Sequence, residues 1–190
     1  QRQMCIRDRF YHMYPIGMTG APRRNESEET VHRFQDLMKW LPHIKDLGCT
    51  AIYIGPLFES TSHGYDTKDY RMVDRRLGDN QDFKGFVEKA HEMDIRVVVD
   101  GVFNHTGSNS RYFNKYGEYD SVGAYQSKES PYYTWFRFMD WPDVYESWWG
   151  MTTLPQIEEH SEECRKYLLS DKDAIVKRWI KNGASGWRLD

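Results

Sequence analysis

The sequence has few cysteines, no long apolar run and no excess of positive charge. Its three cysteines, Cys5, Cys49 and Cys164, form no Cys-x-x-Cys pair and no metal-binding spacing, so we expect neither a zinc site nor a disulfide framework. No stretch of about 18 apolar residues is present, which argues against a transmembrane helix. A formal net charge of -3 indicates no positively charged surface of the kind that binds DNA, RNA or an anionic membrane. We therefore expect no membrane span and no nucleic-acid partner.

No signal peptide can be recognised at the start of the chain. It begins with Gln1 rather than Met, so the sequence leaves open whether the protein is cytoplasmic or secreted. Residues 1–9 show no apolar periodicity, and the letters MCIRDR within them resemble a translated sequencing adapter. We expect residues 1–9 to be a non-native leader and exclude them from the fold. The oligomeric state stays open.

Aromatic residues are abundant in this polar chain. They make up 15% of the sequence, with seven Trp and thirteen Tyr among its 190 residues. Rigid, flat rings suit either an irregular core or a surface that stacks sugars.

From Phe10 onward, short apolar segments alternate with helical patterns. The strand candidates are residues 10–15, 51–54, 95–99 and 185–190. Apolar residues at steps of three and four predict helices near residues 31–47, 83–93 and 175–180.

Local signals mark the ends of these helices. Pro42 is expected to break or kink the first helix, and Asp79 or Asn80 to cap the second. Ser170, with Asp173 three residues later, resembles a capping box for the third.

This alternation predicts an α/β fold with a parallel sheet of right-handed crossover units. Periodicity alone does not separate an open, doubly wound sheet from a barrel. No glycine-rich phosphate-binding turn follows any strand, which disfavours the open sheet. A complete (β/α)8 barrel takes roughly 250 residues, more than this chain has.

A long irregular stretch interrupts the pattern after the third strand. It exceeds the roughly 12 to 15 residues of an ordinary loop, so it predicts a subdomain or binding loop. We divide the chain accordingly into residues 10–105, an insertion at 106–159, and a third helix with the fourth strand at 160–190.

Polar residues follow the predicted strands, where parallel α/β folds place their chemistry. Arg188 and Asp190 lie two positions apart in the fourth strand and therefore on one face. A guanidinium beside a carboxylate favours its ionised form, as a nucleophile requires. A plain structural ion pair is the alternative, and taken alone it is the commoner case.

The other candidates also have simple explanations when taken singly. His105 fits a hydrogen-bonded loop histidine, Asn104 a turn residue, and Gly64-Tyr65-Asp66 a turn. Several aromatic residues of the insertion fit its core equally well: Tyr112, Tyr133, Trp135, Trp141, Trp148 and Trp149.

Together and in order, these segments resemble glycoside hydrolase family 13, the α-amylase family. The resemblance rests on HGYDTKDY, DGVFNH, an insertion ending near LPQIE, and GWRLD, and it covers Phe10 to Asp190. LPQI is followed by Glu158 where many relatives have Asn, so no role is carried over there. The wording SWWGMTTLPQIE and HGYDTKDY is similar to the neopullulanase and cyclomaltodextrinase branch.

The resemblance implies a role for each strand-end residue. Asp190 would be the nucleophile that forms a covalent glycosyl-enzyme, and Arg188 would orient it and keep it charged. Asp100 would tie the third and fourth strands together through Arg188.

The remaining positions would bind substrate or a metal. Tyr65 would stack on the sugar immediately before the scissile bond, Asp66 would support that subsite, and His105 would hydrogen-bond a hydroxyl of the same sugar. Asn104 matches a calcium ligand of many relatives. The chemistry itself needs no cofactor, and calcium would be structural.

The implied fold is the first half of a (β/α)8 TIM barrel, with a domain B insertion after the third strand and truncation after the fourth. The family's general acid, a Glu after the fifth strand, and its stabilising Asp after the seventh have no counterpart here. We therefore expect the 190-residue polypeptide to be inactive and loosely packed or prone to aggregate.

The implied activity of the parent protein is retaining hydrolysis of α-glucosidic bonds in starch, maltodextrins or cyclodextrins. Two alternatives stay open: a family relative that transfers or isomerises glucosyl units, and a non-catalytic binding member.

Overall fold

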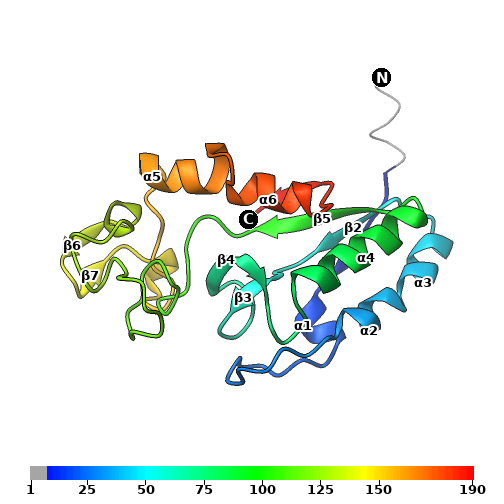
Figure 1. The fold of residues 1–190 in the computed structure, drawn as a ribbon, viewed down its shortest axis with the longest axis horizontal. Coiled ribbons are helices and arrows are strands. Elements are labelled where there is room, and N and C mark those ends of the chain that lie inside the picture. Colours follow the sequence, from blue (N-terminus) through cyan, green and yellow to red (C-terminus); the bar gives the residue numbers. More distant parts are fainter. Residues whose placement is uncertain (1–7) are drawn as a thin grey trace.

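The computed structural model describes residues 8–190 and is built round a four-stranded parallel sheet (Figure 1). The expected leader lies outside the described residues as far as residue 7. Arg9 already takes part in the fold, because its carbonyl oxygen accepts hydrogen bonds from the N–H groups of Thr50 and Ala51.

The central sheet has the order β1-β2-β5-β8. Its strands are β1 (Phe10–Met13), β2 (Ala51–Ile54), β5 (Arg96–Gly101) and β8 (Gly186–Leu189), and all neighbours pair in parallel. The four predicted strands are therefore confirmed within a few residues. Ile52 and Ile54, which share one face of β2, are fully buried, whereas Tyr53 on the other face is only partly buried.

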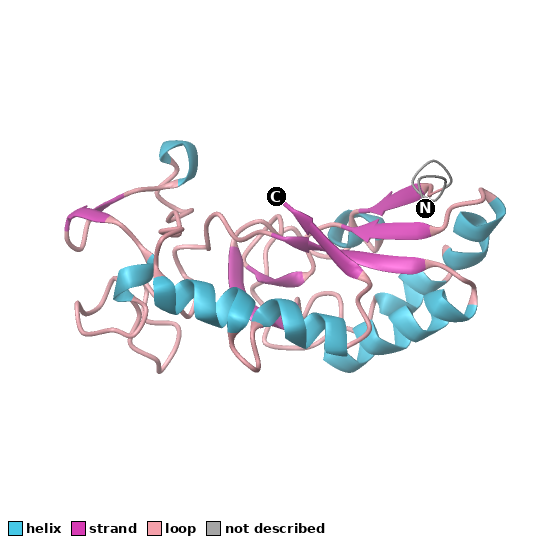
Figure 2. Ribbon diagram, turned by 90° about the horizontal axis from the view of Figure 1, so that it is seen from above, coloured by secondary structure: helices cyan, strands magenta, loops and turns pink. Residues whose placement is uncertain are grey.

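The helices lie along the sheet and shield it (Figure 2). The long α4 runs from Asn80 to Glu92, and the expected first helix is split into α2 (Phe34–Met38) and α3 (Leu41–Asp46). Pro42 lies in the first turn of α3, where its missing N–H costs nothing, so the predicted break is confirmed. A short α1 (Pro15–Met18) follows β1.

The predicted capping box at Ser170 and Asp173 is wrong. The chain forms α5 (Glu162–Arg165), continues as the π-helix η3 (Lys166–Ser170), and restarts as α6 (Ile175–Lys181) after Ala174, which provides no side-chain cap. Ser170 therefore ends one helix rather than starting the next. Ser161 instead caps α5, its hydroxyl accepting from the Cys164 N–H at 3.3 Å.

A small antiparallel pair follows β2, and the sequence did not predict it. Its strands are β3 (Phe58–Ser60) and β4 (Thr67–Val73), joined by the loop that carries Tyr65 and Asp66. The pair packs on α6 through Trp179, which is fully buried. The Trp179 indole N–H donates to the Tyr70 carbonyl oxygen at 2.8 Å.

The insertion extends from the end of β5 to one side of the sheet (Figure 1). It contains a 3-10 turn η1 (Tyr133–Trp135), strands β6 (Phe138–Asp140) and β7 (Val144–Tyr145), and a second turn η2 (Trp148–Gly150). Its core is aromatic, with the Tyr112 and Trp135 rings stacked at 5.0 Å between centroids.

Two of the three cysteines lie within the described residues. Cys49 and Cys164 are free thiols, and burial raises the pKa of the Cys164 thiol to about 12. Cys5 lies outside the described residues. Within residues 8–190, no helix is long and apolar enough to cross a bilayer.

The N-terminus of α4 offers a test of local stability. The Asp79 side chain accepts from the N–H groups of Gln81 and Asp82, and Asp82 returns a bond to the Asp79 N–H. We expect Asp79→Ala to lower the free energy of unfolding by about 1 kcal/mol, because the helix loses this cap. Asp79→Asn is the matched control and should retain most of it. Equal losses in both variants by urea unfolding would contradict the assignment.

Candidate active site

Three of the predicted site residues, Asp100, Arg188 and Asp190, lie at the carboxyl ends of β5 and β8. The parallel register places Asp100 opposite Arg188 and Gly101 opposite Leu189. Asp190 follows β8 directly, and its N–H donates to the Gly101 carbonyl oxygen at 3.2 Å. The sheet thus brings together residues that are about ninety positions apart in sequence.

Arg188 lies between two carboxylates. Its Nη1 donates to Asp100 Oδ1 at 3.2 Å and makes a short ion pair with Asp190 Oδ1. Asp100 is completely buried, and its second oxygen accepts from the Tyr53 hydroxyl at 2.5 Å. Both Asp100 oxygens are therefore bonded, as a buried carboxylate requires.

Burial and hydrogen bonding have opposite effects on these groups. Burial raises the pKa of the Asp100 carboxyl, and the bonds from Tyr53 and Arg188 oppose that rise. The hydrogen bond to Asp190 raises the pKa of the Arg188 guanidinium further, so it stays charged. A permanent positive charge therefore lies beside the Asp190 carboxyl group.

Tyr65 and Asp66 lie in the loop between β3 and β4. Asp66 closes this loop by accepting from the Ser62 hydroxyl at 2.7 Å and from the Gly64 N–H at 3.3 Å. Gly64 has φ +99, and a Cβ there would lie 2.5 Å from the Pro56 side chain, so the turn requires glycine. The carboxylate of Asp66 thus holds the turn that presents Tyr65.

Tyr65 itself is half-buried. Burial raises the pKa of its hydroxyl, and the charges of Asp100 and Asp190 raise it further while Arg188 opposes them. The place of Tyr65 beside the strand-end charges stays a prediction. The stacking of this ring on a sugar stays a prediction.

His105 is buried against the same loop. Its Nε2 donates to the Tyr65 carbonyl oxygen at 3.0 Å, while its Nδ1 is buried and has no hydrogen-bond partner among residues 8–190. Burial lowers the pKa of this imidazole, so it is neutral near pH 7. The predicted bond to a sugar hydroxyl stays a prediction, and Nε2 is already engaged in this structure.

Asn104 connects the ends of β5 and β8, its side-chain N–H donating to the Asp190 carbonyl oxygen at 3.0 Å. A calcium ion takes six to eight oxygen ligands. In the described part of the chain, no group of three carboxylate or histidine ligands surrounds Asn104. Asn amide and backbone carbonyl oxygens also bind calcium, so the calcium site at Asn104 stays a prediction.

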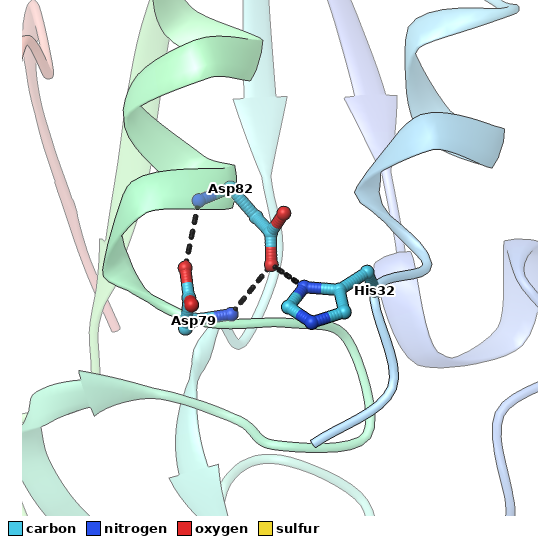
Figure 3. A group of neighbouring side chains, drawn as sticks. All are labelled: His32, Asp79 and Asp82. Carbon is cyan, nitrogen blue, oxygen red and sulfur yellow. Dashed lines mark hydrogen bonds and ion pairs between the residues drawn. The ribbon is translucent and has the colours of Figure 1, made fainter.

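A group with metal-binding spacing does occur elsewhere, at His32, Asp79 and Asp82 (Figure 3). Its groups are already bonded to one another: Asp79 and Asp82 form the capping box of α4, and His32 Nδ1 donates to Asp82 Oδ2 at 2.6 Å. This cluster fixes the α4 N-terminus and carries no indication of a ligand.

Sequence reasoning missed two contributors to the site. Tyr53 bonds Asp100 and stacks on His12 with ring centroids 4.5 Å apart. Trp148, from the insertion, packs on His105 with centroids 5.3 Å apart. A tyrosine hydroxyl within the otherwise apolar strand AIYI is the signal that could have revealed Tyr53.

Comparison with known families matches residues 24–190 to the family described as "Alpha amylase, catalytic domain". An amylopullulanase of Thermoanaerobacterium saccharolyticum is 41% identical over 169 residues, covering 79% of this chain and 13% of that protein. A cyclomaltodextrinase of Thermoanaerobacter pseudethanolicus is 35% identical and covers 95% of this chain and 33% of that protein.

Solved structures agree with this match. The ligand-free cyclic α-maltosyl-(1→6)-maltose hydrolase of Arthrobacter globiformis has a TM-score of 0.79 at 27% identity, covering 97% of this chain and 44% of that one. The chain thus spans less than half the length of these similar proteins.

The pKa values of His105 and His32 are shifted in opposite directions, so the two residues should make stability depend on pH in opposite ways. The folded pKa of His105 lies below the ordinary value of about 6.5, so its contribution is lost as the pH falls below that value. Asp82 raises the folded pKa of His32, so its contribution is present below about 6.5 and lost as the pH rises through the folded pKa.

We expect the urea midpoint of His105→Gln to fall less than that of the wild type between about pH 7 and pH 5. The midpoint of His32→Gln should fall more over the same range. Parallel curves for all three proteins would show that neither histidine is coupled to folding in this way.

Proposed function

The chain belongs to the α-amylase family, and we propose that it supplies the first half of the catalytic (β/α)8 barrel of a retaining α-glucan hydrolase. The observation that carries the proposal is the contact of Arg188 with both Asp100 and Asp190 at the carboxyl end of a parallel sheet. Barrel enzymes of this type place their catalytic groups at that end.

In the proposed reaction, an Asp190 carboxylate oxygen attacks the anomeric carbon and the glycosidic C–O bond breaks. A carboxylic acid gives its proton to the departing oxygen, and the same group later takes a proton from the water that releases the sugar. By the family resemblance, this acid is a Glu that follows a fifth strand. Asp190 supplies the nucleophilic half of the pair.

The neighbouring residues prepare that attack. Arg188 orients the Asp190 carboxyl group through their ion pair, and Asp100 fixes Arg188 from the buried side. We assign Tyr65 to stacking on the reacting sugar, Asp66 to holding its loop, and His105 to one of the sugar's hydroxyls. Two relatives are named cyclomaltodextrinase and amylopullulanase, which supports α-glucan oligosaccharides or polysaccharides as substrates.

A non-catalytic binding role fits the site less well. A protein that only bound glucan would have no need for a carboxylate paired with a guanidinium that is itself anchored by a buried second carboxylate. Transfer to a sugar acceptor would use the same nucleophile, so this site supports hydrolysis and transfer equally. Calcium at Asn104 stays an expectation from the resemblance, and no step depends on it.

Loss of the nucleophile is the first test. We expect Asp190→Asn in the full-length protein to lower kcat on maltodextrin by roughly 10³-fold or more, because the amide cannot form the glycosyl-enzyme. Asp36→Asn, at an exposed carboxylate of α2, is the matched control and should leave kcat unchanged. Proton NMR of the first product should show the α-anomer; a β-anomer would overturn the retaining mechanism.

The isolated chain provides a second test. We expect the purified 190-residue polypeptide to release no sugar from maltodextrin, because a departing oxygen without an acid would leave as an alkoxide. Reducing-sugar release measured beside the full-length protein checks this. Hydrolysis by the short chain that Asp190→Asn abolishes would show that the acid lies within these residues.

A further inference from the structure

Trp149 is the most exposed of the large apolar side chains that the structure describes, at 86%. It lies in the turn η2 of the insertion, between Trp148 and Gly150. Single exposed apolar residues are common on protein surfaces, so exposure alone carries no function. The backbone and the neighbours of this ring supply the argument.

The backbone at Trp149 is held in an unfavourable conformation. Its φ of +50 and ψ of +30 fall in the left-handed region, which bulky side chains rarely adopt. The surrounding turn enforces it: the Trp148 N–H donates to the Leu154 carbonyl oxygen at 2.9 Å, and the Gly150 N–H donates to Ser147 at 3.1 Å. Strained residues cluster at functional sites, so this conformation of an exposed ring points to a function.

The ring continues an aromatic path that begins at the candidate active site. The Trp148 and Trp149 rings are nearly parallel, at 12° with centroids 5.9 Å apart. Trp148 in turn packs on His105, which bonds Tyr65. The insertion rings are therefore not all core: Trp135 is 2% exposed, whereas Trp149 faces solvent beside the site.

We propose that Trp149, steadied by Trp148, is a stacking platform for a glucose unit of the α-glucan beyond the sugar bound at Tyr65 and His105. The inference rests on the proposed function. A flat, uncharged indole face matches the apolar C–H face of a pyranose ring and loses little conformational freedom on binding. The platform would add affinity for chains long enough to reach it and none for the shortest substrates.

The test uses Trp149→Asn in the full-length protein that also carries Asp190→Asn, so that binding is measured without turnover. Asparagine tolerates the left-handed conformation, so this change removes the ring and relieves the backbone. We expect affinity for maltoheptaose by calorimetry to fall roughly 5- to 30-fold, with maltose unaffected and Tm unchanged or raised. Trp149→Phe should retain most of the affinity.

Trp40→Ala is the matched control, since Trp40 is 40% exposed and directly precedes α3. It should leave maltoheptaose binding unchanged. In the Asp190-intact enzyme, Trp149→Asn should raise KM for long maltodextrins and leave kcat on maltotriose unchanged.

Two results would overturn the proposal. Unchanged maltoheptaose binding in Trp149→Asn would show that the ring has no ligand role. A lowered Tm or altered oligomeric state, with binding unchanged, would show that another protein surface covers the ring. If the wild type cleaves α-glucan in either case, only this inference fails; a wild type that neither binds nor cleaves α-glucan overturns the proposed function as well.

Discussion

The contact of Arg188 with Asp100 is the interaction on which the site depends. Asp100 is fully buried at the end of β5, where an unpaired carboxylate would be costly, and the parallel register brings the guanidinium of β8 directly opposite it. Tyr53 satisfies the remaining Asp100 oxygen from β2. Hydrogen bonds thus link side chains of the three neighbouring strands β2, β5 and β8. Arg188, held in this network, positions the Asp190 carboxyl group.

The insertion is positioned by the same region of the sheet. Isolated bridges pair His105 with Gln156 and Ser147 with Pro155, so the two ends of a long segment return to each other next to the site. The Ile157 N–H also donates to the Asn104 carbonyl oxygen at 2.8 Å. An aromatic-rich segment without regular structure can therefore present Trp148 to His105 in a defined arrangement, because both of its ends are fixed.

The sequence predicted those features that local patterns determine. The buried strands, the break at Pro42 and the Asp79 cap each follow from a few adjacent residues. The pairing of Arg188 with Asp190 follows from the two-residue period of a strand. The β3–β4 pair and the Tyr53 bond to Asp100 depend on contacts between distant segments, and the Ser170 prediction failed because η3 extends α5 through that residue.

The charges of the site explain why one arginine can serve two carboxylates. The Asp100 and Asp190 carboxyl groups contact the same guanidinium, so their negative charges repel each other. Asp100 Oδ2, however, accepts a hydrogen bond from the Tyr53 hydroxyl at 2.5 Å. This bond partly compensates the negative charge of Asp100 on the side that does not contact Arg188. Arg188 makes its closer contact with Asp190, which is more exposed to solvent than Asp100. The buried Asp100 therefore anchors the guanidinium, which also pairs with the more exposed carboxyl group of Asp190.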